Sequence, residues 1–193
     1  MDNLKMEYEC SIEGMILKAE ELMKMPKKKL VEVSCESLIN LFHTADKITT
    51  LKTQELADTL KFDKVKSVQL VCFRNPRKLG TCDSSGNIRI NFKTFFEYDY
   101  EGVIGVIIHE LCHTEQHNHS KKFWTLFEQS CKRIGVLPSE YDGWFIDYIE
   151  DSPFMFIGPW KRKYHPQKYS IIRNKICYPD YFLGQNIYTL KSV

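Results

Sequence analysis

The feature that most constrains the fold is the segment VIGVIIHELCHTEQHNHS at residues 103–120, in which an apolar run leads into a cluster of histidines. Apolar residues on nearly every side of a helix predict a helix that is buried at the centre of a domain. We expect this helix to begin near Asp99. The chain has six histidines, and four of them fall between residues 109 and 119. The segment therefore predicts a buried helix that carries ionisable side chains into the interior.

The first five residues of the cluster form the pattern H-E-x-x-H, from His109 to His113. Two histidines four residues apart leave a helix from the same face, so both imidazoles can bind one ion. Neutral imidazole suits zinc, at about 2.0–2.1 Å. Glu110 is rotated by about 100° around the helix axis, where it can reach a metal-bound water without ligating the metal. We predict that His109 and His113 are metal ligands and that Glu110 is the general base.

A catalytic zinc site needs a third protein ligand and one open position, and His117 and His119 are the two candidates. His117 lies a further turn along the helix, where the same ion is hard to reach. His119 stands directly before Ser120, an expected N-cap at which the chain leaves the first helix and turns back. Helix geometry therefore favours His119 as the third ligand, with His117 as the alternative.

Helices are also predicted on both sides of this segment. Residues 1–66 form an expected N-terminal helical segment, in which apolar residues recur at helical spacing and Pro26 breaks the pattern. After Ser120, a second helix should run to Gly135, which favours helix ends. Its apolar residues Phe123, Trp124 and Phe127 are most simply core residues.

Two strands are predicted between these helical regions. SVQLVCF at residues 67–73 is rich in β-branched and aromatic residues, and IRINFK at residues 88–93 alternates with period two. The turn residues between them suggest a β-hairpin or meander. In the second strand, we expect Ile88, Ile90 and Phe92 to be buried and Arg89, Asn91 and Lys93 to face water.

The last part of the chain, residues 136–193, changes from an acidic stretch to a basic, proline-containing one. We expect an irregular segment that packs on the core. The chain as a whole is predicted to be one α+β domain over residues 1–193, with a catalytic core at residues 67–135.

Composition indicates a cytoplasmic protein with free thiols. The seven cysteines are an odd number and include no C-x-x-C pair, so a disulfide framework and a cysteine-paired zinc ribbon are not expected. The N-terminus lacks the apolar region of a secretory signal. The run GVIGVII at residues 102–108 is too short to span a membrane. The net charge of +2 gives no general reason to expect a polyanionic partner.

Two stretches carry a resemblance to a known family. RNPRKLGTCDSSGNIRIN at residues 74–91 and VIIHELCHTEQHNHSKKFW at residues 106–124 resemble the YgjP-like metallopeptidases and their SprT-like relatives, over about residues 67–135. The resemblance implies a zincin-like fold, with the strand near residues 87–93 at the sheet edge beside the cleft. It implies one catalytic Zn²⁺ with a general base. The ligands it assigns are His109, His113 and His119, and the base is Glu110.

The function expected from this site is hydrolysis of peptide bonds in a peptide or protein substrate, which could pair with the strand at residues 87–93. One alternative is a SprT-like protease that acts on proteins bound to nucleic acid. This protease would bind nucleic acid through a basic stripe around the strands. We prefer to interpret the stripe as a polar face that is exposed to solvent. The stripe comprises Arg74, Arg77, Lys78, Arg89 and Lys93. A second alternative is a metal-binding domain without turnover. It does not explain Glu110, because a purely structural metal site needs no base beside an open coordination position.

Overall fold

The computed structural model describes residues 11–75, 77–136 and 164–179. These residues form seven helices and one three-stranded sheet, which confirms the α+β class. The helices are α2 (Ile12–Lys24), α3 (Lys27–Glu32), α4 (Cys35–Leu60), α5 (Thr94–Glu97), α6 (Tyr100–His113), α7 (Lys121–Ile134) and α8 (Pro166–Cys177). The strands are β1 (Ser67–Val71), β2 (Gly80–Cys82) and β3 (Asn87–Asn91). None of the helices in these three ranges has both the length and the apolar character of a membrane span.

The N-terminal helices begin and end at residues suited to those positions. The side chain of Ser11 accepts a hydrogen bond from the first turn of α2, and Ser34 does the same for α4. Pro26 separates α2 from α3, as predicted, and a second break before Ser34 separates α3 from α4. Helix α4 ends at Leu60 and is followed by the C-cap residue Lys61, whose φ of 68° is left-handed. Residues 11–66 therefore contain three helices, where the sequence had indicated one break.

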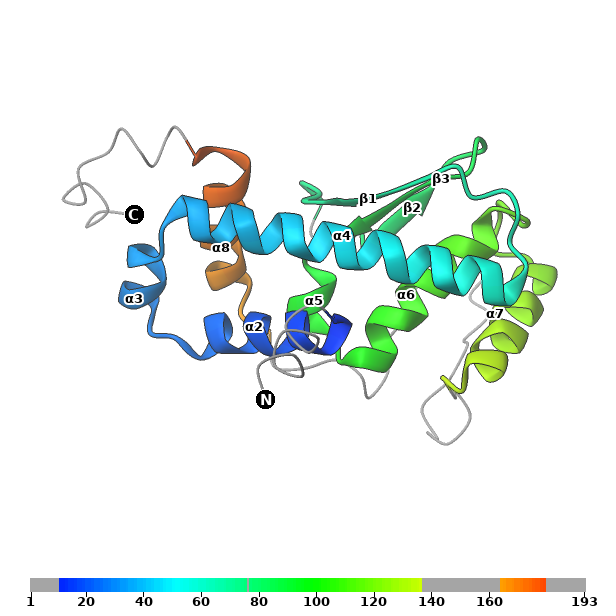
Figure 1. Cartoon of the computed structure of the whole chain (residues 1–193), viewed down its shortest axis with the longest axis horizontal. Coiled ribbons are helices and arrows are strands. Elements are labelled where there is room, and N and C mark those ends of the chain that lie inside the picture. Colours follow the sequence, from blue (N-terminus) through cyan, green and yellow to red (C-terminus); the bar gives the residue numbers. More distant parts are fainter. Residues whose placement is uncertain (1–10, 76, 137–163, 180–193) are drawn as a thin grey trace.

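The long helix α4 runs along most of the molecule, with α3 and α8 near one end and α7 near the other (Figure 1). It packs against β1 and α6. Helix α6 also contacts β2, β3 and α7, so it lies between the sheet and the neighbouring helices. This arrangement explains why α6 is buried on nearly all sides, as its sequence predicts.

The sheet order is β1-β3-β2. Strand β1 runs parallel to β3, and β2 runs antiparallel to β3. The expected hairpin between residues 67–73 and 88–93 is therefore wrong: the hairpin partner of β3 is β2, which lies in the predicted turn region. The expected edge position of residues 87–93 is also wrong, because β3 is paired on both sides. Strand β2 lies at the edge that contacts α6.

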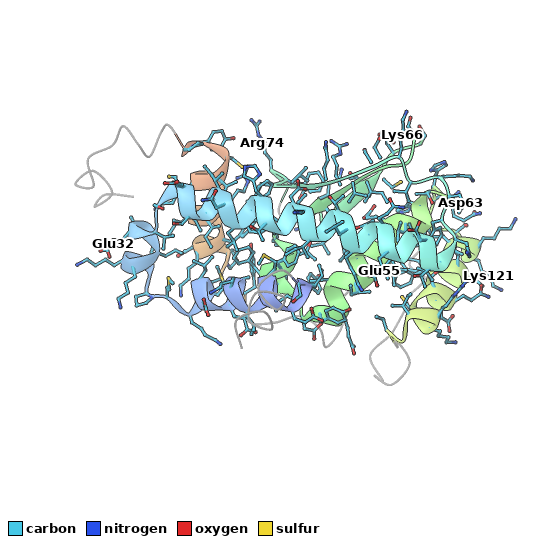
Figure 2. All side chains as sticks on the ribbon, viewed as in Figure 1. Glu32, Glu55, Asp63, Lys66, Arg74 and Lys121 are labelled. Carbon is cyan, nitrogen blue, oxygen red and sulfur yellow. The ribbon has the colours of Figure 1, made fainter. Side chains whose placement is uncertain are left out.

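The alternation in β3 is only partly as expected. Ile88, Ile90 and Phe92 are buried and Arg89 is exposed, as predicted, but Asn91 and Lys93 are buried as well. Lys93 forms a buried ion pair with Glu97 of α5. The expected basic stripe therefore loses Lys93, whereas Arg74 lies at the outside of the molecule (Figure 2).

Helix α8 corrects the expectation of an irregular C-terminal segment at residues 166–177. It packs against α3 and α4. The ammonium groups of Lys168 and Lys175 donate hydrogen bonds to backbone carbonyls at the C-terminal ends of α2 and α3. The acceptors are Met23 and Met25 for Lys168, and Val31 and Val33 for Lys175. Both lysines satisfy carbonyls that have no partner within their own helix. The remaining parts of the predicted segment, residues 137–163 and 180–193, lie outside the described residues.

Candidate metal centre

The H-E-x-x-H pattern lies at the C-terminal end of helix α6. The carboxylate of Asp99 caps its first turn by accepting a hydrogen bond from the Gly102 N–H at 3.1 Å. The helix ends at His113, and the hydroxyl of Thr114 donates to the carbonyl of Leu111. The chain then turns back before α7 begins after Ser120. The predicted N-cap position of Ser120 is confirmed, although its side chain makes no capping hydrogen bond. His119 therefore lies in the connection between the two helices.

The structure brings the imidazole rings of His109, His113 and His119 together. The three Nε2 atoms are 3.2 Å apart for His109 and His113, 3.2 Å for His113 and His119, and 3.0 Å for His109 and His119. An ion bound at about 2.0–2.1 Å with tetrahedral angles would hold such nitrogens about 3.3 Å apart. The spacing of the ring nitrogens therefore fits a small tetrahedral cation.

The tautomer of His113 follows from its neighbour. Its Nδ1 is 3.0 Å from the carbonyl oxygen of Gln116, so Nδ1 carries the proton and donates it. The Nε2 atom then has a free lone pair that faces the other two rings. This is the usual arrangement of a metal-ligating histidine, in which a backbone carbonyl fixes the second ring nitrogen. The structure brings His119, and not the exposed His117, to the rings of His109 and His113.

Aromatic side chains of α7 hold these rings in place. The ring of Phe123 contacts all three imidazoles, with centroid distances of 4.9 Å to His109, 4.5 Å to His113 and 4.8 Å to His119. Trp124 stacks on His119 at 5.6 Å. The sequence predicted these aromatics as core residues, and Phe123 is indeed fully buried. Their second role, as the wall of the histidine cluster, could be read only from how α7 packs on α6.

The surroundings favour the neutral form of the imidazoles. Burial lowers the pKa of His109 well below its usual value, and the nearby His113 and His119 lower it further. Burial also lowers the pKa of His113 and of His119. Neutral imidazole is the form that binds a metal. The three side chains are therefore ready to act as ligands at neutral pH.

The side chain of Glu110 lies against Gly80 of β2, at the edge of the sheet. Its side chain is buried, and a Cβ atom placed on Gly80 of β2 would come within 2.5 Å of its Oε1. Its Oε2 atom is buried and has no hydrogen-bond partner among the described residues. Burial raises the pKa of the carboxyl to about 8, and the positive charge of Lys78 offsets part of this effect. A cation at the histidines would lower this pKa, because an opposite charge favours the carboxylate.

The three converging imidazoles come from one helix and the turn after it, and they form a group that could hold a metal ion, as in metallopeptidases. The comparison with protein families agrees, since the model of the YgjP-like metallopeptidase domain matches residues 8–136. The chain therefore belongs to the YgjP-like metallopeptidase family. Comparisons with curated proteins and with solved structures gave no match. The family match begins far before residue 67, so α2, α3 and α4 are part of the family domain.

Proposed function

We propose that this protein is a zinc-dependent metallopeptidase that hydrolyses peptide bonds in peptide or protein substrates. His109, His113 and His119 hold the ion, and Glu110 is the general base. The observation that carries this proposal is the convergence of three Nε2 atoms within 3.2 Å of one another. A set of three imidazoles suits zinc better than magnesium or calcium, which prefer oxygen ligands.

When it is bound, zinc supplies a Lewis acid that polarises a carbonyl group and lowers the pKa of a water molecule. In this proposal Glu110 accepts a proton from the attacking water as the water oxygen bonds to the peptide carbon. Glu110 then gives the proton to the leaving nitrogen as the carbon–nitrogen bond breaks. The buried Oε2 atom supports this role, because it has no hydrogen-bond donor among the described residues that would compete for its lone pairs.

As far as the described residues show, the sheet leaves one edge for a substrate backbone, and this edge lies beside the carboxylate. Strand β3 is central, so a peptide has no free edge there. The outer edge of β1 is covered by α4, because the side chain of Asp46 accepts a hydrogen bond from the Leu70 N–H at 2.6 Å. We therefore place the substrate along β2, whose Gly80 touches Glu110. Backbone pairing of this kind does not read sequence, so specificity depends on side-chain pockets.

Replacement of Glu110 by glutamine tests the proposal. Glu110→Gln should bind zinc and fold as the wild type does, but its kcat on an unfolded protein such as casein should fall by about 10²–10⁴-fold, the usual contribution of a general base. Glu115→Gln is a matched control, because Glu115 is exposed just after α6 and pairs with Lys64. Full activity of Glu110→Gln would remove Glu110 from its role, and purified protein without bound zinc would contradict the choice of metal.

The proposal places the enzyme in the cytoplasm, where thiols remain reduced. This agrees with the free thiols of Cys35, Cys72, Cys82, Cys112, Cys131 and Cys177 in the described part of the chain. The alternative of a protease that acts on nucleic-acid-bound proteins is less favoured, because Lys93 is buried in an ion pair. Casein cleavage that rises on addition of DNA, and loses this dependence at high salt, would favour the alternative.

A further inference from the structure

Asn91, at the end of β3, is a polar residue with only 1% of its surface exposed. Each end of its carboxamide is hydrogen-bonded. Its Nδ2 donates to the Lys78 carbonyl at 2.6 Å, and its Oδ1 accepts from the Lys93 N–H at 3.2 Å. Its backbone N–H donates to the Leu79 carbonyl at 2.7 Å. The buried side-chain amide thus bonds two backbone groups and the backbone N–H of Asn91 bonds a third, which together fix the relative position of the segments that carry them.

The segment held by Asn91 leads directly into the edge strand. Lys78 and Leu79 immediately precede Gly80, the first residue of β2. Strand β2 has only three residues, and its pairing with β3 ends where Gly80 faces Ile90. The bonds from Asn91 to Lys78 and Leu79 therefore attach the chain before β2 to β3, beyond the last residue pair between the two strands.

Helix α8 fixes the orientation of this amide. The hydroxyl of Tyr169 donates to Oδ1 of Asn91 at 3.3 Å. Burial and the neighbouring Cys72 raise the pKa of Tyr169 far above its usual value, so the hydroxyl remains a donor. Because Oδ1 faces this donor and the Lys93 N–H, Nδ2 must face the Lys78 carbonyl. The Tyr169 ring is itself packed on Phe96 of α5, with centroids 5.3 Å apart.

We propose that Asn91 is a positioning residue, oriented by Tyr169 of α8, that holds strand β2 against Glu110. The inference rests on the proposed function, in which Glu110 and the β2 edge act on the substrate. Strand β2 acts on Glu110 through the contact at Gly80, where the carboxylate packs against the backbone of β2. A shift of β2 therefore changes the position of Glu110 and of the substrate together, without touching the three histidines. Tyr169 of α8 thus helps to position the catalytic carboxylate, although it does not touch it.

Activity measurements on two variants test this role. Asn91→Ala removes the amide, and Tyr169→Phe removes only the hydroxyl. Misplacement of catalytic groups by about 1 Å costs up to about 10²-fold, so we expect kcat to fall roughly 10- to 100-fold for Asn91→Ala and several-fold for Tyr169→Phe. Zinc content should remain that of the wild type in both. Tyr178→Phe makes the same chemical change at an exposed position just after α8, and it should leave kcat unchanged.

The position of β2 can be followed without any substrate. Cys82 is the last residue of β2, and Cys35 at the start of α4 is similarly half-buried. Alkylation of each thiol by iodoacetamide, mapped by mass spectrometry, reports local opening of its segment. Loss of one hydrogen bond should raise the alkylation rate of Cys82 about fivefold relative to Cys35 in Tyr169→Phe, and more in Asn91→Ala. Tyr178→Phe should give the wild-type ratio.

The two measurements separate a positioning role from a merely structural one. Faster alkylation of Cys82 together with a lower kcat at full zinc content supports the inference. Unchanged alkylation of Cys82 in Tyr169→Phe overturns it, and so does faster alkylation with unchanged kcat. If Asn91→Ala does not fold, Tyr169→Phe decides the matter alone. The alkylation measurement needs no peptide hydrolysis, so a failure of the proposed function is recognised separately: the wild type is then inactive, while Cys82 is still alkylated faster in the two variants.

Discussion

The carboxylate of Glu110 lies directly on the backbone of Gly80. A Cβ atom at residue 80 would come within 2.5 Å of Oε1 and within 2.7 Å of both Cγ and Cδ of Glu110. The contact involves most of the side chain, and Glu110 is only 5% exposed, so it has little room to move aside. Gly80 is not among the glycines with positive φ, which are Gly86 and Gly135 in the described chain. Its lack of a side chain, and not its backbone freedom, is what this contact requires.

Gly80→Ala should therefore displace Glu110 and lower kcat by roughly 10- to 100-fold, the cost of misplacing a catalytic group by about 1 Å. Zinc binding should be unchanged, because the added methyl group faces Glu110 and not the histidines. Steady-state kinetics and metal analysis of the same preparation check both parts. Thr81→Ser, a change at the next residue of β2 that adds no atoms, serves as the control. Wild-type kcat in Gly80→Ala would show that Glu110 tolerates the displacement.

His119→Ala should lose zinc affinity by more than about 100-fold, since loss of an outer-shell partner alone costs 10- to 100-fold. His117→Ala should bind zinc as the wild type does, because His117 is exposed and lies outside the group of three. Competition with a chromophoric chelator measures both affinities. The reverse order of effects would assign the third ligand to His117.

The metal-free protein should become less stable as the pH falls below about 6.5, the ordinary histidine value. The pKa of each clustered histidine is lower in the folded state than this value. The unfolded chain therefore binds more protons than the folded chain below pH 6.5. The contribution of these histidines to the free energy of unfolding is therefore fully present above that pH and is lost as the pH falls.

Thermal melts of chelator-treated protein from about pH 7.5 to about pH 5.5 measure this dependence on pH. His117→Ala should follow the wild-type curve, because His117 is not in the cluster. Replacement of His109 by glutamine should flatten the curve, since His109 is the most deeply buried of the three. An equally steep curve in that variant would place the responsible groups elsewhere.

Lys175→Met should lower the free energy of unfolding by about 1–3 kcal/mol, because it leaves two backbone carbonyls at the end of α3 without their donor. Urea unfolding followed by circular dichroism measures the change. Lys132→Met is the control, since Lys132 forms an exposed ion pair with Glu128, a type of contact that contributes about 0–1 kcal/mol. Equal effects of the two substitutions would mean that the bonds to α3 do not stabilise the fold.

Local patterns in the sequence were enough to predict the helices that carry the site. The bounds of α6 and α7 follow from apolar periodicity and from end residues such as Asp99 and Gly135, all of which act within a few residues. The meeting of the three histidines follows from the spacing of His109 and His113 on a helix and from the turn before Ser120. These features depend on local backbone geometry, which sequence spacing describes well.

The order of the strands and the burial of single polar residues could not be predicted in this way. Strand β2 has three residues, too few to show a period, and the parallel pairing of β1 with β3 depends on contacts between distant segments. Asn91 and Lys93 occupy positions that alternation assigns to water, but partners from α5, α8 and the segment before β2 surround them. Helix α8 was missed because its apolar residues are interrupted by charged ones, two of which, Lys168 and Lys175, bond carbonyls at the ends of α2 and α3.

The bonds from α8 to the first helices also set an order of events during synthesis. The lysine donors and their carbonyl acceptors are separated by 142 to 145 residues along the chain. On the ribosome, α2 and α3 therefore emerge long before the side chains that cap their ends. The carbonyls at the ends of α2 and α3 therefore gain these donors only after translation has passed residue 175, so the last turns of both helices are completed late in synthesis.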